Sequence, residues 1–139
     1  MKYNKPYIFL WITALIILIS GGILFFVKGN IAFNLNLFDT YYVVLNIYLT
    51  LFLAFICFLT GAGYKYMDDA GKAPAGSLTK IHVFTTEISA VLCWITAFTL
   101  GSKPLAEGSN LPLVFLGFLI LLLAIQILYF VNLIRSAVN

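Results

Sequence analysis

Four long stretches of the chain consist almost entirely of apolar residues, and short segments rich in Gly, Pro, Asn and charged residues separate them. The stretches run over about 7–27, 41–62, 81–100 and 111–134. Each is close to the roughly 20 residues that an α-helix needs to cross the hydrocarbon core of a bilayer. The pattern predicts an all-α, integral membrane four-helix bundle, folded as a single transmembrane domain over residues 1–139.

Composition excludes several classes of protein. Hydrophobic residues make up 63% of the chain and charged residues only 9%, whereas soluble domains carry roughly 25% charged residues. A water-soluble enzyme, a nucleic-acid-binding protein and a disordered tail are therefore excluded. We expect the lipid bilayer to be the main surrounding of this chain, and no nucleic acid among its partners.

The distribution of basic residues predicts the orientation. Six of the eight lie at the N-terminus, in the segment 64–80 or at the C-terminus, and the other two segments hold one each. Because lysine and arginine accumulate on the cytoplasmic side of membrane proteins, we expect both termini in the cytoplasm and a location in the bacterial inner membrane. The six are Lys2, Lys5, Lys65, Lys72, Lys80 and Arg135, and the two are Lys28 and Lys103.

Small residues within the apolar stretches predict close helix packing. Ser20, Gly21 and Gly22 lie in the first stretch, and Gly61 and Gly63 lie at the end of the second. Helices approach one another closely in membranes where such residues meet.

Two polar residues lie deep within the last two stretches. A charge at bilayer depth costs roughly 2.5 to 3.5 kcal/mol, so Glu87 requires a partner or a function, and a protonated carboxyl is the expected form. Gln126 lies at a similar depth on the antiparallel fourth stretch. We expect Glu87 and Gln126 to form a hydrogen bond between helices, which is either structural or part of a path for protons or ions.

Other polar residues gather near the ends of the second and third stretches. Asn46, Tyr48 and Thr50 predict a polar patch in the outer half of the bundle. His82 is the only histidine, and we expect a neutral, hydrogen-bonded imidazole with a structural role. One histidine cannot provide two histidine ligands to a haem within one chain.

One segment of the sequence resembles a segment of a known protein family. Residues 38–49 read Phe-Asp-Thr-Tyr-Tyr-Val-Val-Leu-Asn-Ile-Tyr-Leu, which resembles the His-Asp-Thr-Tyr-Tyr-Val-Val-Ala-His-Phe-His-Tyr segment of subunit I of the haem-copper oxidases (cytochrome c oxidase). Residues 20–22, 80–84 and 129–136 are similar to segments of the same subunit in the same order. The whole chain thus resembles the ninth to twelfth helices of subunit I.

The positions that carry chemistry in that family differ here. Asn46 and Tyr48 occupy the positions of the two histidines that bind the oxygen-binding haem and the low-spin haem. Asp39 keeps the aspartate of a His-Asp pair that binds magnesium, but Phe38 replaces the histidine. Asp39 is therefore a weak metal candidate and a better N-cap for the second helix. His82 matches a residue that is not a ligand in the family.

The resemblance implies a non-catalytic, subunit I-like protein, because the haem and copper ligands of the family are absent. We expect it to be an accessory or assembly component of a respiratory or haem/copper-handling membrane complex, with other membrane subunits or further copies as partners and no cofactor of its own. Two alternatives stay open. Partner chains could complete a haem or metal site with Tyr48, His82 or Asp39, or the protein could conduct protons or ions through Glu87 and Gln126.

Overall fold

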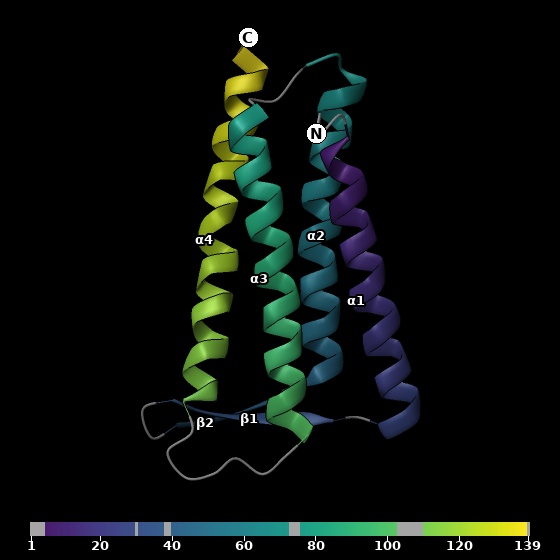
Figure 1. Ribbon diagram of the computed structural model, residues 1–139, viewed down its shortest axis with the longest axis vertical. Coiled ribbons are helices and arrows are strands. Elements are labelled where there is room, and N and C mark those ends of the chain that lie inside the picture. Colours follow the sequence, from purple (N-terminus) through teal and green to yellow (C-terminus); the bar gives the residue numbers. More distant parts are fainter. Residues whose placement is uncertain (1–4, 30, 38–39, 73–75, 103–109, 139) are drawn as a thin grey trace.

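The computed structural model describes residues 5–29, 31–37, 40–72, 76–102 and 110–138, and four long helices dominate it (Figure 1). All four are long and apolar enough to cross a membrane. The prediction of four helices with the length and hydropathy of membrane spans is therefore confirmed, which suggests an integral membrane protein. They are α1 (Pro6–Lys28), α2 (Asn46–Asp69), α3 (Gly76–Ser102) and α4 (Leu111–Val138).

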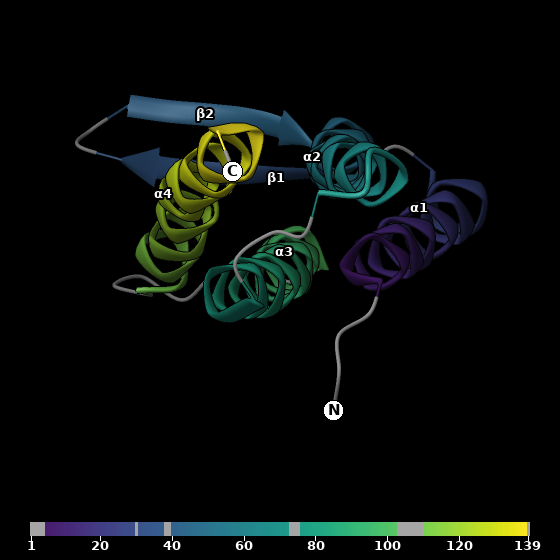
Figure 2. The same ribbon diagram turned by 90° about the horizontal axis from the view of Figure 1, so that it is seen from above.

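The helices run roughly parallel to one axis and form one bundle (Figures 1 and 2). α1 packs most extensively against α2, and α3 against α4. Both chain termini lie at one end of the bundle, which we call the terminal end. The opposite end carries a two-stranded sheet and is called the hairpin end.

The prediction that a helix begins at Tyr41 is wrong. Strands β1 (Ala32–Leu37) and β2 (Thr40–Leu45) form an antiparallel hairpin in which Ala32 pairs with Leu45 and Leu37 with Thr40. α2 begins only at Asn46, with Leu45 as its N-cap. The segment Ala32–Leu37 alternates apolar and polar residues, the period of a strand, and β2 is rich in tyrosine and valine, which favour strands.

The hairpin closes one end of the helix bundle. The side chains of Phe33 and Leu35 are buried in the core, and the rings of Phe33 and Phe115 meet edge to face with centroids 5.3 Å apart. The opposite face of the hairpin is exposed, including Tyr41 and Val43. The apolar half of the alternating pattern thus packs beneath α4, which holds the sheet against the helices.

The predicted connecting segment 64–80 is mostly helical. α2 continues to Asp69 and α3 already begins at Gly76, so most of the segment belongs to these two helices. The apolar stretch was predicted to end where charged residues begin. The helix continues beyond that point because charged side chains are compatible with a helix when they are exposed to solvent. Lys65 and Asp69 form a salt bridge one turn apart in this extension, which favours helix.

Glycines of α1 and α2 lie where the two helices touch. A Cβ atom on Gly21 would meet the side chain of Thr50, and one on Gly61 would meet Trp11. The Trp11 Nε1 also donates a hydrogen bond to the carbonyl oxygen of Phe58 at 3.3 Å. The predicted close approach is confirmed at Gly21 and Gly61, whereas a Cβ on Gly22 would meet nothing within 4 Å.

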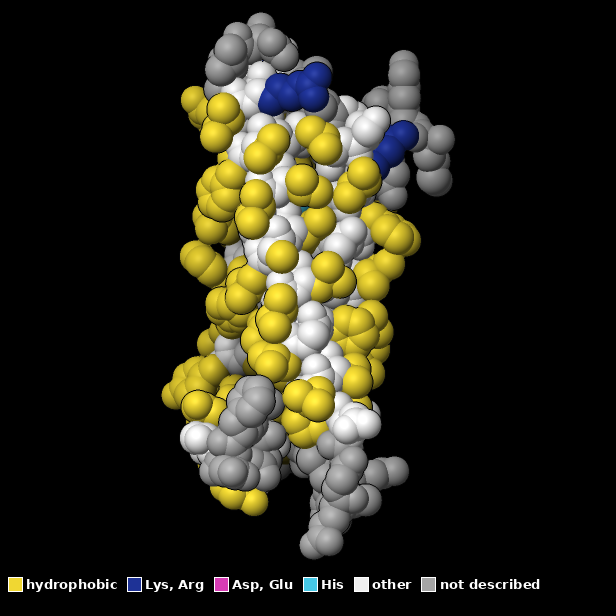
Figure 3. Space-filling model, turned by 90° about the vertical axis from the view of Figure 1, so that its left-hand side faces the viewer, with side chains coloured by type: hydrophobic (Ala, Val, Ile, Leu, Met, Phe, Trp, Pro, Cys, Tyr) yellow, Lys and Arg dark blue, Asp and Glu magenta, His cyan; other side chains and the backbone are white. Residues whose placement is uncertain are grey.

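The outer surface of the bundle is largely apolar. Figure 3 shows the side of the molecule that α4 occupies, where hydrophobic side chains cover the height of the helices and basic side chains lie near the terminal end. Ile127 and Phe130 on α4 are 66% and 60% exposed. Such a surface is stable in contact with lipid chains and not with water.

Candidate functional site

One stripe of α3 residues, five of them polar and one a cysteine, lines the interior of the bundle. They recur every three or four residues, so they share one face of the helix. From the first to the last the stripe extends over about 26 Å at ~1.5 Å per residue, close to the thickness of the hydrocarbon core. All of them are buried: Thr79, His82, Thr86, Ser89, Cys93 and Thr96.

His82 lies at the centre of a hydrogen-bonded cluster that joins three helices. Its Nδ1 is 3.1 Å from the hydroxyl of Tyr64 on α2, and its Nε2 is 3.2 Å from the Oε1 of Gln126 on α4. The amide oxygen of Gln126 can only accept, so Nε2 carries the hydrogen and Nδ1 accepts from Tyr64. A neutral imidazole with this tautomer satisfies both bonds.

Asn132 extends the cluster toward the terminal end. Its Nδ2 donates to the hydroxyl of Thr79 at 2.7 Å and to that of Tyr64 at 3.4 Å. The ring of Tyr129 stacks on the His82 ring with centroids 5.4 Å apart. Each helix from α2 to α4 thus contributes side chains. We use the name His82 cluster for Tyr64, Thr79, His82, Thr86, Gln126 and Asn132.

The structure does not join Glu87 to Gln126 as expected. The Nε2 of Gln126 donates to the carbonyl oxygen of Leu122 at 2.9 Å and to the Thr86 hydroxyl at 3.5 Å, so both of its hydrogens are used. Glu87 follows Thr86 on α3 and is turned by about 100° around the helix axis. It faces α1 instead, where its carboxyl group interacts with the side chain of Thr13.

Glu87 lies near the middle of its membrane-spanning helix. The span runs over Gly76–Gly101, which places Glu87 about 16 Å from one end and about 21 Å from the other. Its Oε1 is buried and has no hydrogen-bond partner within the described part of the chain. Cys57 of α2 lies near enough to interact with it electrostatically. A carboxyl group therefore lies at the junction of three helices.

Asn46 and Tyr48 do not face a common site. Asn46 is buried, with its Oδ1 unpartnered among the described residues, whereas Tyr48 is 64% exposed. Of the expected patch, only Asn46 and Thr50 share a face, and the Thr50 hydroxyl donates to the Asn46 carbonyl oxygen at 2.9 Å. Thr50 also accepts from the Trp94 Nε1 at 3.3 Å. Residues two apart on a helix point in nearly opposite directions, which separates Tyr48 from the other two.

Asp39 and Phe38 lie outside the described residues. Asp39 is not the N-cap of α2, because Leu45 takes that position. Among the residues that the structure describes, no group of three or more His, Cys, Asp or Glu side chains gathers at a position where it could hold a metal ion. Cys57 and Cys93 are both buried and free.

Four members of the His82 cluster were missed by sequence reasoning, namely Tyr64, Thr79, Thr86 and Asn132. A signal for two of them was present, because Thr79, His82 and Thr86 follow the spacing of one helix face. For Tyr64 and Asn132 no pattern within their own helices identifies the partner, which lies on another helix.

Comparison with known proteins gives no match: no protein-family model, no curated protein and no solved structure is recognisably similar to this chain. Its resemblance to the oxidase subunit therefore rests on the quoted residues, of which Thr40–Leu45 form strand β2.

Proposed function

We propose that this protein is a non-catalytic, oxidase subunit I-like membrane subunit that acts as an accessory or assembly component of a respiratory or haem/copper-handling membrane complex. In this role it binds other membrane subunits through its helices and holds no cofactor of its own. The amino-acid sequence of residues 38–49 supports the proposed family. The surface of α1 and α2 supports a role in binding partner helices.

The observation that carries the proposal is a groove of about 820 Å³ between α1 and α2. Its floor includes Ala14 and Ala54, which are buried, and large side chains form its walls. Each helix contributes residues at positions i, i+3, i+4 and i+7, the spacing at which a third helix packs. Small residues flanked by large ones favour close helix packing in membranes. The four positions are Trp11, Ala14, Leu15 and Leu18 on α1, and Leu51, Ala54, Phe55 and Phe58 on α2.

The residues at the former haem-ligand positions support a role without catalysis. Asn46 points into the bundle beside Thr50, and Tyr48 points outward. The amide of Asn46 is not equivalent to a histidine as an axial haem ligand. Asn46 and Tyr48 also lie in different environments, one inside the bundle and one on its outer surface. The interior polar groups near the terminal end hydrogen-bond to one another within the His82 cluster, which is the arrangement of a structural core.

The distribution of basic residues supports an orientation in which the chain spans a bacterial inner membrane and both termini lie in the cytoplasm. Of the basic residues described, five belong to the terminal end and Lys28 alone to the hairpin end. This asymmetry follows the positive-inside rule. The five are Lys5, Lys65, Lys72, Lys80 and Arg135.

The test is the size of the complex that the protein forms in its own host. Extracted in mild detergent, the tagged protein is expected to elute as a large complex, with its absorption spectrum recorded across the peak. Replacing Leu15 and Phe55 with alanine removes two exposed walls of the groove, and we expect the protein to shift to a small peak because central apolar side chains dominate such interfaces.

Matched replacements on α4 provide the control. Ile127 and Phe130 are exposed to a similar extent, and their replacement with alanine is expected to leave the large complex intact. A small peak for the unaltered protein, or equal losses for both pairs, would contradict the proposal.

One observation favours a second candidate function, a proton-binding protein. Glu87 places a carboxyl group near the middle of a membrane span, with Thr13 beside it and with its Oε1 buried and unpartnered among the described residues. A charge at this depth is costly, so the carboxyl is expected to be protonated. A proton suits the site better than a metal ion, because hard cations take six or more oxygen ligands and Thr13 supplies one.

A hydrophobic carbodiimide tests this second candidate, since it modifies protonated carboxyls that lie in apolar surroundings. We expect the adduct to form at Glu87 and to disappear in Glu87→Gln, while the exposed Asp68 and Asp69 stay unmodified. Proton flux through liposomes is then compared between the two proteins. Flux that is unchanged in Glu87→Gln would remove the candidate, even where the adduct forms.

A further inference from the structure

A second groove lies between α2 and α4 at the terminal end. It has a volume of about 360 Å³, and the two helices touch sparsely along their length. Apolar and aromatic side chains form most of its lining, and one basic residue lies at its edge. The lining consists of Tyr66, Met67, Ala70, Lys72, Leu133 and Ile134.

The groove lies where the surface of a membrane would be. α2 ends at Asp69 and its membrane span ends there too, so Tyr66 and Met67 belong to the last turns of the span. On α4, Leu133 and Ile134 precede Ser136, the end of the other span. A ligand in this groove would therefore have one part among hydrocarbon chains and another at the level of the head groups.

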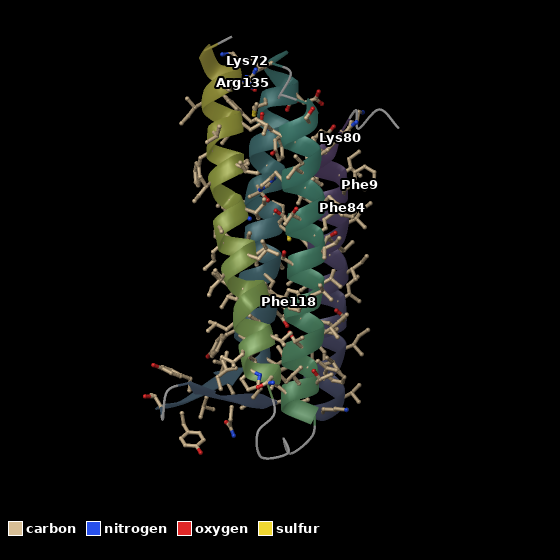
Figure 4. The ribbon with its side chains drawn as sticks, turned by 60° about the vertical axis from the view of Figure 1, so that its left-hand side comes forward. Phe9, Lys72, Lys80, Phe84, Phe118 and Arg135 are labelled. Carbon is tan, nitrogen blue, oxygen red and sulfur yellow. The ribbon has the colours of Figure 1, made fainter. Side chains whose placement is uncertain are left out.

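Two basic residues lie near the groove at the terminal end, and one of them lines it. Lys72 lines it, and Arg135 follows Ile134 in the last turns of α4. Figure 4 shows Lys72 and Arg135 at the same corner of the terminal end, whereas Lys80 lies on the other side of α3. Both side chains carry several hydrogen-bond donors, so each can bind a phosphate oxygen in addition to its contacts within the protein.

The acidic residues of α2 lie on another side of the helix. Asp69 bonds to Lys65, and Asp68 also interacts with Lys65 electrostatically. The Lys65 ammonium lies over the ring of Tyr7, 5.6 Å from its centroid, which places this acidic pair toward α1. Neither aspartate lines the groove, in which Lys72 is the one charged residue of the described lining.

We propose that this groove binds an anionic phospholipid, whose phosphate contacts Lys72 and Arg135 and one of whose acyl chains lies along Tyr66, Leu133 and Ile134. An apolar groove with two basic residues near it at the membrane surface matches such a lipid in both of its parts. A free phosphate would leave the apolar lining unused, and an uncharged lipid would make no ionic contact with Lys72 and Arg135. The site is independent of the partner groove between α1 and α2.

The experiment measures lipid binding by the full chain purified in mild detergent. Phosphatidylglycerol and phosphatidylcholine are added separately, and the bound lipid is counted by native mass spectrometry together with the midpoint of thermal unfolding. We expect phosphatidylglycerol to bind and to raise the midpoint, and phosphatidylcholine to do so much more weakly. The difference should shrink with added salt, because screening weakens contacts between exposed charges.

Three variants locate the site. The double variant Lys72→Gln, Arg135→Gln is expected to bind phosphatidylglycerol about 25-fold more weakly, at roughly fivefold per basic residue. Lys80→Gln removes the same charge at the same end of the bundle but on the other side of α3, so its binding should be unchanged. Leu133→Trp fills the apolar part and is expected to weaken binding with both charges in place.

The proposal is overturned if Lys80→Gln weakens binding as much as the double variant, which would indicate a diffuse surface effect. It is also overturned if both lipids bind equally, or if inorganic phosphate alone raises the unfolding midpoint as much as phosphatidylglycerol does, since that result would indicate a simple anion site.

Discussion

Replacement of His82 with alanine is expected to lower the free energy of unfolding by about 3 kcal/mol. The imidazole is fully buried and packs against the rings of Tyr64 and Tyr129 at 5.6 and 5.4 Å between centroids. Its loss leaves a cavity, and it also leaves the Tyr64 hydroxyl and the Gln126 carbonyl without their partner. Buried polar groups without partners are costly inside a membrane.

The measurement is a denaturant titration of the purified protein in micelles, followed by circular dichroism. Ile81→Ala is the control, because Ile81 is the preceding residue of the same helix and is 51% exposed, so its loss should change the free energy by less than about 0.5 kcal/mol. Equal effects for the two variants would show that the His82 cluster contributes nothing particular to stability.

Replacement of Gly63 with alanine is expected to cost about 2 kcal/mol, the magnitude of overpacking in a filled core. A Cβ atom at this position would collide with the hydroxyl of Tyr129 on α4. Tyr129 cannot move without disturbing the ring of His82, on which it stacks. The added methyl group therefore displaces a side chain that belongs to the packing of three helices.

A second substitution separates this collision from other effects of alanine. Tyr129→Phe removes the colliding oxygen but keeps the ring, whose Cζ would still lie 2.8 Å from the new Cβ, so Gly63→Ala should cost less in that background. Gly22→Ala is the control, since a Cβ there meets nothing within 4 Å and alanine favours helix by up to about 1 kcal/mol. The same titration measures all variants, and a Gly63→Ala protein as stable as Gly22→Ala would contradict this reasoning.

The number of helices and their approximate positions could be predicted because a bilayer imposes a single requirement on each. About 20 apolar residues in a row are sufficient to identify a span, and every predicted stretch overlaps one of the four helices. The hairpin was not predicted, because residues 41–45 are as apolar as the helix that follows them. The alternation in Ala32–Leu37 was the available signal, and hydropathy alone does not distinguish periods of 2 and 3.6 residues.

The pairing of polar side chains was decided only by the tertiary structure. The sequence indicated that Glu87 and Gln126 lie at similar depth, but depth does not specify the direction in which a side chain points around its helix. Gln126 meets His82, and Glu87 meets Thr13 on the first helix, because the rotation of each helix is set by how its small residues fit the neighbouring helix. The sequence by itself thus determined the four long apolar helices and the polar residues within them. The partners of those residues depend on the rotation of each helix and on which helices are neighbours in the bundle. Only packing between distant segments of the chain decides both.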